Sequence, residues 1–515
     1  MEQLLLLKNK INNFLERKVL LSDDILKEID DKTLEIDWPQ DFLILNKENF
    51  SLLKEKKEID WQEFDKQRVL LELGKENNYS DYGLVEKEKV GVEFSGGGRT
   101  SILQSYDKKT KKYGVQDFVR YFIHRYKALE KILRNRQELL DVVSINRIIK
   151  KTERENVALI GMIVEKNLTS NGNLLLKVED LTGSIKVLVS KKNPELFEEA
   201  KDLVLDEVIG LTGMNGDKIV FTNKLFWPDI PFNKDLKKTP DEVYALVLAD
   251  IHVGSIDFLP DGFDRFLKWI NGEVGNEKQK EMAKKTKYIF ICGDLVDGVG
   301  IYPSQESELV IKDIYKQYEE CANLLKQIPA DKQLIICAGN HDALRLAEPQ
   351  PILAKDFAKP LFDLPNTTFV SNPATVTIHA SENFSGLDVL LYHGYSLDYY
   401  YTQVDKLRLN KAMDKPHLIL KFLLKKRHLA PSHSSTLYIP DAVEDPLVIN
   451  KIPDLVVTGH IHKPGATNYR NITIVCGSCW QAKTSFQEKV GHEPEPGKIP
   501  IINLQTREIK FLNFI

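Results

Sequence analysis

The C-terminal half of the chain contains a series of short apolar runs, each of which ends abruptly in Asp, Asn or His. These runs are YALVLADIH, KYIFICGDLVDG, QLIICAGNHD, DVLLYHG and DLVVTGHIH, with helical patterns between them. Buried strands that alternate with helices are typical of an α/β layered domain. In such domains the carboxyl ends of the strands meet in one crevice. We therefore predict an α/β domain over residues 241–515 that gathers these polar residues at a single site.

The residues that end these runs are of the types that bind transition metals. They are, in chain order, Asp250, His252, Asp294, Asp297, Asn340, His341, Asp342, His393, His460 and His462. A single Asp or His after a strand is usually a turn former or a cap. Five of the eleven histidines lie in these runs, however, and this concentration favours a metal site. Because a carboxylate can bridge two cations about 3.5–4 Å apart, the mixed ligands predict a two-metal centre for Mn, Fe or Zn.

The chain before this domain divides into four further segments. Apolar residues at helical spacing predict a small helical module over residues 1–73, and a region rich in Gly, Ser and Asn predicts a linker over 74–114. Residues 115–155 predict a helical connector. Residues 156–235 contain β-rich runs separated by Asn-Gly and Thr-Gly turns, with one helix before the last pair, which predicts an OB-fold barrel. The expected fold class is thus α/β, in several domains.

The barrel segment contains few aromatic residues. Barrels of this kind bind single-stranded nucleic acid through aromatic platforms, so we favour a structural or docking role for it over direct strand binding. The formal net charge of −4 likewise gives the chain no global field that would attract nucleic acid. Contact with DNA would therefore depend on metal ions or on local basic residues. The candidates are Arg345, Lys425, Lys426 and Arg427, although a charge run is also common on solvated surfaces.

Targeting and redox signals are weak in this sequence. The opening residues MEQLLLLK contain an apolar run too short for a signal peptide or a membrane span. The five cysteines do not form a disulfide framework, so we expect a cytoplasmic protein with no membrane partner. The motif from Cys476 to Cys479 is either half of a zinc site or a strand that runs into a turn. We favour the second interpretation, because no further pair accompanies the motif.

The order D-x-H, G-D-x-x-D, G-N-H-D, H-G and G-H-x-H over residues 244–480 resembles the calcineurin-like metallophosphoesterases. This resemblance implies a two-sheet catalytic domain with two divalent ions, Mn²⁺ foremost, and Mg²⁺, Fe or Zn as alternatives. The first ion would be held by Asp250, His252, Asp294 and His462. The second would be held by Asn340, His393 and His460, with Asp294 as the bridge between the two.

The same resemblance implies roles for the remaining motif residues. His341 would be the catalytic histidine, which orients the phosphate and protonates the leaving group. Asp342 would orient His341. Asp297 would contact the ligands rather than the ions.

Motifs outside the ligand set resemble the small subunits of archaeal family-D DNA polymerases. They are AGNHDALRLAEPQP (338–351), KKRHLAP (425–431), PDLVVTGHIHKPG (453–465) and WQAKTSFQ (480–487). This resemblance covers about residues 115–515. It implies a 3′–5′ proofreading exonuclease that acts on the 3′ end of a primer or on single-stranded DNA. It also implies a large polymerising subunit as partner, with a sliding clamp as a further candidate.

Two alternatives to the exonuclease remain open. One is a catalytically silent scaffold of a polymerase, because the related eukaryotic subunits share the architecture but have lost the ligands. The intact ligands of this chain disfavour that alternative. The other is a phosphatase or small-molecule phosphodiesterase of the same fold, which would need neither the helical nor the barrel domain.

Overall fold

The computed structural model describes residues 99–515, except for 107, 109, 110 and 442, and three earlier strands of two residues each. These strands are β1 (Leu20–Leu21), β2 (Ile44–Leu45) and β3 (Val92–Glu93). Residues 1–88 and 89–515 form separate compact units. In the first unit, β1 pairs in parallel with β2. The helical module predicted over 1–73 otherwise lies outside the described residues.

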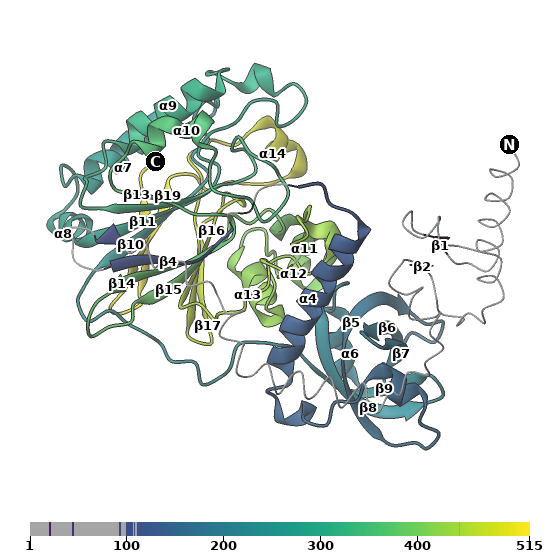
Figure 1. Cartoon of the computed structure of the whole chain (residues 1–515). Coiled ribbons are helices and arrows are strands. Elements are labelled where there is room, and N and C mark those ends of the chain that lie inside the picture. Colours follow the sequence, from purple (N-terminus) through teal and green to yellow (C-terminus); the bar gives the residue numbers. More distant parts are fainter. Residues whose placement is uncertain are drawn as a thin grey trace, which may run out of the picture. The chain divides into compact units, whose positions relative to one another are not determined.

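The C-terminal domain is a sandwich of two sheets with helices on its outer faces (Figure 1). The strand order of the six-stranded sheet is β13 (Thr367–Phe369), β12 (Gln333–Cys337), β11 (Thr286–Cys292), β10 (Tyr244–Leu248), β19 (Lys498–Asn503) and β20 (Ile509–Asn513). The order of the seven-stranded sheet is β17 (Gly465–Tyr469), β18 (Ile472–Cys476), β16 (Leu455–Thr458), β15 (Leu387–Leu391), β14 (Ala374–Ala380), β4 (Arg99–Ser105) and β3. The predicted α/β class with a two-sheet C-terminal domain is confirmed.

Alternation along the strands explains the layers. On β10, Ala245 and Val247 face the core between the two sheets, whereas Leu246 and Leu248 face a second core under the helices. The helices over the six-stranded sheet are α7 (Pro260–Ile270), α8 (Glu277–Lys285), α9 (Ile314–Leu325) and α10 (Lys355–Phe362). A third core lies on the outer face of the seven-stranded sheet, under α11 (Leu397–Gln403), α12 (Asp405–Leu409) and α13 (His417–Lys426). Strands buried on both faces read as continuous apolar runs, as they do in this sequence.

The predicted linker over 74–114 is wrong for residues 99–105. These residues form β4, which pairs antiparallel with β14. The strand RTSILQS is only partly buried and contains mostly polar residues, so its sequence lacks the apolar run that revealed the other strands. For the Cys476–Cys479 motif, the structure agrees with the interpretation as a strand that runs into a turn, because β18 ends at Cys476.

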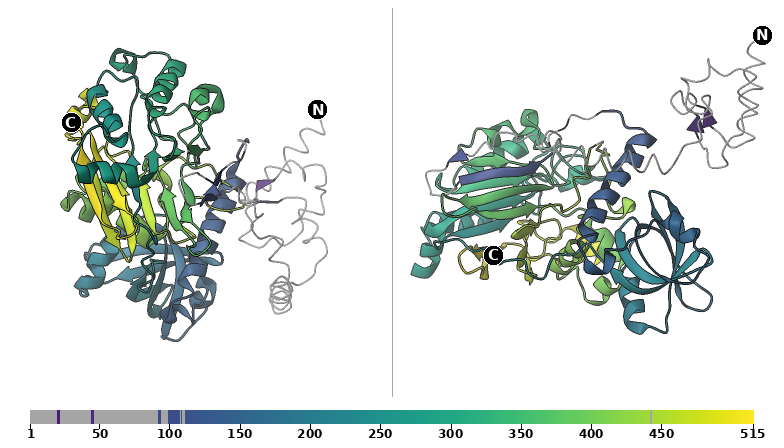
Figure 2. Two further views of the ribbon diagram at one scale, coloured as in Figure 1. Left: turned by 90° about the vertical axis from the view of Figure 1, so that its left-hand side faces the viewer. Right: turned by 60° about the horizontal axis from the view of Figure 1, so that its bottom comes forward.

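A closed barrel of five strands precedes the two-sheet domain (Figure 2). Its strands follow in the order β5 (Asn156–Leu168), β6 (Leu174–Asp180), β7 (Gly183–Val189), β9 (Ile219–Phe226) and β8 (Val208–Gly216), and α6 (Pro194–Lys201) lies between β7 and β8 in the chain. A closed five-stranded barrel with a helix before β8, the fourth of its strands in the chain, is consistent with the predicted OB fold. Within the described part of the chain, no helix is both long and apolar enough to cross a membrane.

The basic run at the end of α13 packs against the barrel. Lys426 is buried and its Nζ lies 2.6 Å from Oε2 of Glu207, while Arg427 is buried and donates to two main-chain carbonyls. The Nζ of the half-buried Lys425 lies 3.5 Å from the ring centroid of Trp227. The predicted DNA contact is therefore wrong for Lys426 and Arg427, because both side chains are buried and bind groups within the protein. In the sequence, three adjacent basic residues resemble an exposed basic patch. The groups that pair with Lys426 and Arg427 are distant in the chain, so no local pattern indicated that the two side chains are buried.

The helix α4 (Val115–Leu133) packs on the C-terminal domain through a buried polar network, and α5 (Ile145–Ile149) follows it. Asp445 accepts hydrogen bonds from the Tyr121 hydroxyl (2.7 Å) and from Nε of Arg125 (2.7 Å). His428 completes the network: its Nε2 lies 2.8 Å from Asp445, and its Nδ1 accepts the N–H of Ala430 at 2.9 Å. Both nitrogens of the neutral ring are thereby satisfied. A second ring proton would break the bond to Ala430.

This network makes stability depend on pH. Burial and the charge of Arg125 lower the pKa of His428 to about 4, whereas an unfolded histidine has a pKa of about 6.5. Between these values the unfolded chain binds the proton and the folded chain does not. We therefore expect His428 to remove about 3 kcal/mol of stability as pH falls from about 6.5 to 4, with none of this loss above pH 7.

The measurement is urea unfolding of the wild type and of His428→Gln at pH 7 and pH 4.5. Glutamine can still donate to Asp445 but does not titrate in this range. The variant should therefore lose less stability on acidification than the wild type. Equal losses for the two proteins would show that His428 is not the titrating group.

Candidate metal centre

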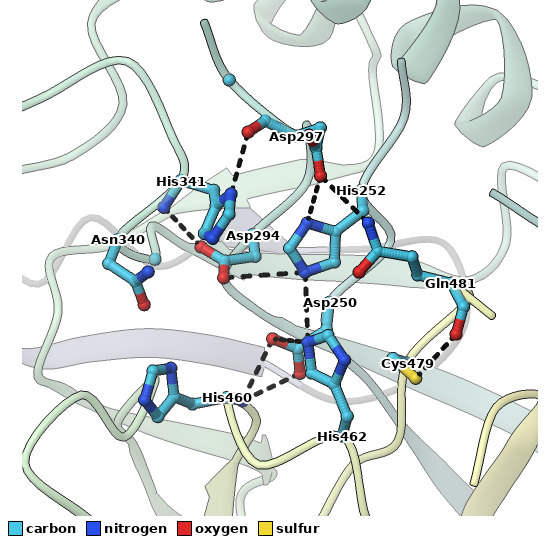
Figure 3. A network of polar contacts seen from close by, with 12 residues as sticks. Asp250, His252, Asp294, Asp297, Asn340, His341, His460, His462, Cys479 and Gln481 are labelled. Carbon is cyan, nitrogen blue, oxygen red and sulfur yellow. Dashed lines mark hydrogen bonds and ion pairs between the residues drawn. The ribbon is translucent and has the colours of Figure 1, made fainter. Parts of the chain in front are cut away.

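The predicted ligands lie at the carboxyl ends of strands from both sheets (Figure 3). The strands β10, β11 and β12 are parallel, as are β15 and β16, so the loops that follow them emerge at the same edge of each sheet. Three groups of side chains bring their ligand atoms within 4.8 Å of one another. The groups are Asp250, His252 and His462; His252, Asp294 and His341; and Asp294, His393 and His460.

Asp294 belongs to two of these groups. Its Oδ2 lies 3.8 Å from Nε2 of His252 and 3.3 Å from Nε2 of His393. Asn340 lies beside the second group, with its Oδ1 2.8 Å from Nε2 of His393. One carboxylate thus stands between two sets of nitrogen and oxygen donors, which is the arrangement that a bridging ligand requires.

The ligands are aimed inward by an unusual backbone. Asp250, His252, Asp294, His460 and His462 all have positive φ angles, between 51° and 71°. This left-handed region is costly for residues with a Cβ, and such strain gathers at functional sites. Hydrogen bonds within the site stabilise it: the N–H of His460 donates to Oδ2 of Asp250 at 2.8 Å. The strand ends are therefore held in a conformation that turns their side chains toward one centre.

Two glycines allow the loops to approach the carboxylates closely. A Cβ on Gly339 would lie 2.2 Å from Oδ1 of Asp294, and a Cβ on Gly459 would lie 2.7 Å from Oδ2 of Asp250. Real Cβ atoms do not come this close to other atoms, so any larger residue would displace the carboxylate. The glycines of the G-N-H-D and G-H-x-H motifs are thus required by space.

Four side chains that the sequence did not reveal hold the ligands in place. Nε2 of Gln305 and Nε2 of Gln481 donate to the carboxylate of Asp297 at 3.0 and 3.1 Å, and that carboxylate contacts Nδ1 of His252 at 3.1 Å. Asp297 thus contacts a candidate ligand, and its supporting role stays a prediction. The two glutamines are distant from each other in sequence; Gln481 lies in the WQAKTSFQ motif, whereas no motif marked Gln305.

The remaining two supports act on the histidines of the G-H-x-H motif. Oδ2 of Asp398 lies 3.1 Å from Nε2 of His460, and Nε2 of Gln487 lies 2.9 Å from Nδ1 of His462. Partners of this kind fix the orientation of a metal-binding ring. The WQAKTSFQ motif contains Gln487 and so carried the only sequence signal for this contact.

His341 is held differently from its prediction. The ring Nδ1 of His341 contacts the main-chain oxygen of Asp297 at 2.8 Å. The main-chain N–H of His341 donates to Oδ1 of Asp294, also at 2.8 Å. Asp342 instead accepts the N–H of Gly339 (2.8 Å) and the hydroxyl of Tyr318 (3.1 Å). Burial and the nearby Asp294 raise the pKa of Asp342 to about 7. The prediction that Asp342 orients His341 is therefore wrong, because Asp342 shapes the turn below the histidine.

The electrostatics of the site fit a bound cation. Burial raises the pKa of Asp250 well above its ordinary value. Burial also disfavours ionisation of Asp294, but His393 and His341 hold its pKa well below the usual range. Burial would lower the pKa of His393, yet Asp294 raises it to about 10. Buried carboxylates thus retain a proton on His393 to balance their charge, and a divalent cation could take the place of that proton.

Of the predicted basic contacts, Arg345 lies closest in the chain to the site. Its guanidinium is half-buried, with donation from Nη2 to the carbonyl of Pro349 at 2.7 Å, and it lies 5.5 Å from the ring centroid of Tyr106. Its contact with DNA stays a prediction.

The comparisons with known proteins agree with this geometry. The pattern of the calcineurin-like phosphoesterase family matches residues 244–464. The DNA polymerase II small subunit of Pyrococcus furiosus is 39% identical over 403 residues, which are 78% of this chain and 64% of that protein. The protein of the same name from Methanothermobacter thermautotrophicus is 36% identical over 76% of this chain and 78% of its own length. That from Archaeoglobus fulgidus is 38% identical over 76% of each.

The fold and the ligand set thus define a calcineurin-like phosphoesterase domain. The chain as a whole belongs to the family of DNA polymerase II small subunits, which confirms the resemblance seen in its motifs. It spans 64% of the length of the Pyrococcus furiosus relative.

The close approach of Gly339 to Asp294 predicts the effect of one added methyl group. We expect Gly339→Ala to displace the Asp294 carboxylate and to weaken Mn²⁺ binding at least about 10-fold, the usual cost of disturbing a ligand's support. Isothermal titration calorimetry of the metal-free protein measures this change. Gly114→Ala is the matched control, because a Cβ at Gly114 meets no atom within 4 Å. Equal affinities for the two variants would contradict the close packing.

Proposed function

We propose that this chain is the 3′–5′ proofreading exonuclease subunit of a DNA polymerase. The observation that carries this proposal is the position of Asp294 between two groups of donors, one with His252 and His341 and the other with His393 and His460. A catalytically silent scaffold would need none of these ligands. The positive φ angles of five of them also disfavour a scaffold, because a backbone strain of this kind is retained where it serves a site.

We further propose two Mn²⁺ ions as the cofactors. Asp250, His252, Asp294 and His462 would hold the first ion, and Asp294, Asn340, His393 and His460 the second. Imidazole, carboxylate and amide donors together suit Mn²⁺ better than a hard cation such as Ca²⁺. Bound ions of this kind polarise the phosphate and supply the nucleophile from water.

His341 is placed to serve the leaving group. It is half-buried, whereas most of the ligands are buried, and it lies in the group that contains Asp294. If Nδ1 of His341 donates its proton in a hydrogen bond to the carbonyl of Asp297, a protonated His341 would carry its second proton on Nε2. That proton would pass to the leaving O3′ of the next nucleotide as the terminal nucleotide is released.

The relatives are named small subunits, which implies a larger partner for them. We propose that this chain also works in the cytoplasm beside a large catalytic subunit, which performs synthesis. A subunit that edits a primer end must keep a fixed geometry to the site of synthesis, and this requirement favours a large and stable interface. The five-stranded barrel then serves in docking, and a sliding clamp is a further candidate partner.

The test is digestion of a primer with a mismatched 3′ end by the chain alone and by its complex with the large subunit. A 5′-labelled primer should give a ladder of shorter products, and a 3′-labelled primer should give labelled mononucleotide at once. Chelation should abolish both, and Mn²⁺ should restore them better than Ca²⁺. Activity confined to p-nitrophenyl phosphate or cyclic nucleotides would instead support a small-molecule phosphodiesterase. A stable complex with no activity on any substrate would support the scaffold.

The histidines should separate metal binding from turnover. His341→Ala should lower kcat by about 10²–10⁴-fold, the usual contribution of a general acid, and should keep both ions. His460→Ala should lose metal and turnover together, because it removes a ligand. Metal content per chain and single-turnover rates measure the two effects. A His341→Ala protein that purifies without metal would refute the division of roles.

A further inference from the structure

Two half-buried tyrosines contact histidines of the metal centre, and the catalytic assignments use neither of them. The ring centroid of Tyr302 lies 6.5 Å from that of His341, with the planes at 67°. The ring centroid of Tyr395 lies 5.7 Å from that of His460, with the planes at 55°. Figure 3 shows His341 and His460 with Asp294 between them. The two tyrosines therefore adjoin different ends of the centre.

Tyr302 is held rigidly in its loop. Its hydroxyl donates to Oε2 of Glu308 at 2.6 Å. The buried Gln305 accepts the N–H of Ile301 at 2.9 Å and donates to the carbonyl of Asp297 at 2.8 Å. The loop that carries the ring is thereby tied to the same residue that orients His252 and His341. A ring fixed in this way loses little conformational entropy when a ligand packs against it.

Tyr395 lies in the turn between β15 and α11, and its neighbours fix its backbone. A Cβ on the preceding Gly394 would lie 2.9 Å from Oγ1 of Thr458. The Oγ of the following Ser396 donates to the carbonyl of Leu429 at 2.7 Å. The hydroxyl of Tyr395 makes no hydrogen bond to any residue that the structure describes. The turn thus presents a partly exposed ring beside the ligand His460 without another evident task for it.

We propose that Tyr302 and Tyr395 are stacking platforms for the two bases on either side of the scissile phosphate, an inference that rests on the proposed nuclease function. The phosphate between the last two nucleotides would lie at Asp294 and the ions. One base would then stack on each ring. Aromatic rings accept any base, because every base has a π face, so the site would be tolerant of sequence.

This arrangement would select the form of the DNA end. Two adjacent bases cannot lie on separate platforms while they remain paired and stacked in a duplex. A mispaired end costs less to unstack than a paired one, so it would enter the site more readily. The tyrosines would thereby convert loss of base pairing into preference for cleavage, without reading the identity of any base.

The test measures equilibrium binding of single-stranded oligonucleotides to His341→Ala protein with Mn²⁺, by fluorescence anisotropy. Three strands are compared: one with all bases, one abasic at the 3′-terminal nucleotide and one abasic at the penultimate nucleotide. In this background, Tyr302→Ala and Tyr395→Ala should each weaken binding of the full strand about 5- to 100-fold. Each variant should lose this effect on one of the two abasic strands, and a different one for each tyrosine. Replacement by Phe should restore binding to within about 2-fold, since stacking needs the ring and not the hydroxyl.

The control is Tyr315→Ala, an exposed tyrosine on α9 whose ring contacts Phe357 at 5.3 Å between centroids. It should leave the binding of all three strands unchanged. If the tyrosine variants weaken all strands equally, the rings only support the histidines and the proposal fails. It also fails if the parent protein binds the abasic and full strands alike. If the pattern holds but the wild-type chain cleaves none of the strands, the stacking sites stand and the nuclease function falls.

Discussion

The buried carboxylate of Asp294 is the contact on which the rest of the site depends. It accepts the N–H of His341, adjoins histidines of both donor groups, and is approached by Gly339 to a distance that excludes any side chain. Its charge lies among other buried carboxylates, which is unfavourable unless a cation compensates it. The strain and burial around Asp294 therefore fit a candidate cation site: the arrangement is costly while its charge is unbalanced and would be stabilised by bound cations.

The catalytic domain is joined to the rest of the unit by buried charges as well as by apolar contacts. Arg125 on α4 pairs with Asp445, and Lys426 at the end of α13 pairs with Glu207 of the barrel, with all four side chains buried. Buried pairs contribute little net stability compared with apolar packing, but a displaced partner leaves an uncompensated charge. We infer that these pairs fix the orientation of barrel, connector and catalytic domain. Such fixed geometry suits a subunit whose site must stay aligned with that of a partner.

The side chains that gather around Asp294 could be picked out from the sequence because their signal is local. A strand shows as an apolar run, and its end shows as a change to Asp, Asn or His, so Asp250, Asp294 and His460 could be found without tertiary information. The failures share the opposite property. Lys426 and Arg427 looked exposed because their partners lie far away in the chain, and β4 looked like a linker because it is a partly buried strand. The role of Asp342 failed because adjacency in sequence did not imply contact between the side chains.

The two segments that contain the tyrosines also contain supports of the candidate metal centre. Gln305 follows Tyr302 and fixes Asp297, while Asp398 follows Tyr395 and contacts His460. If the tyrosines stack on DNA bases as proposed, each segment would link a surface for substrate to the orientation of a histidine. A displacement of either segment would then change both, so the binding of a DNA end and the positioning of the candidate ligands would be coupled through the same backbone. Motifs such as H-G mark the candidate ligand at the start of such a segment, whereas the tyrosines that would reach the substrate have no comparable mark in the sequence.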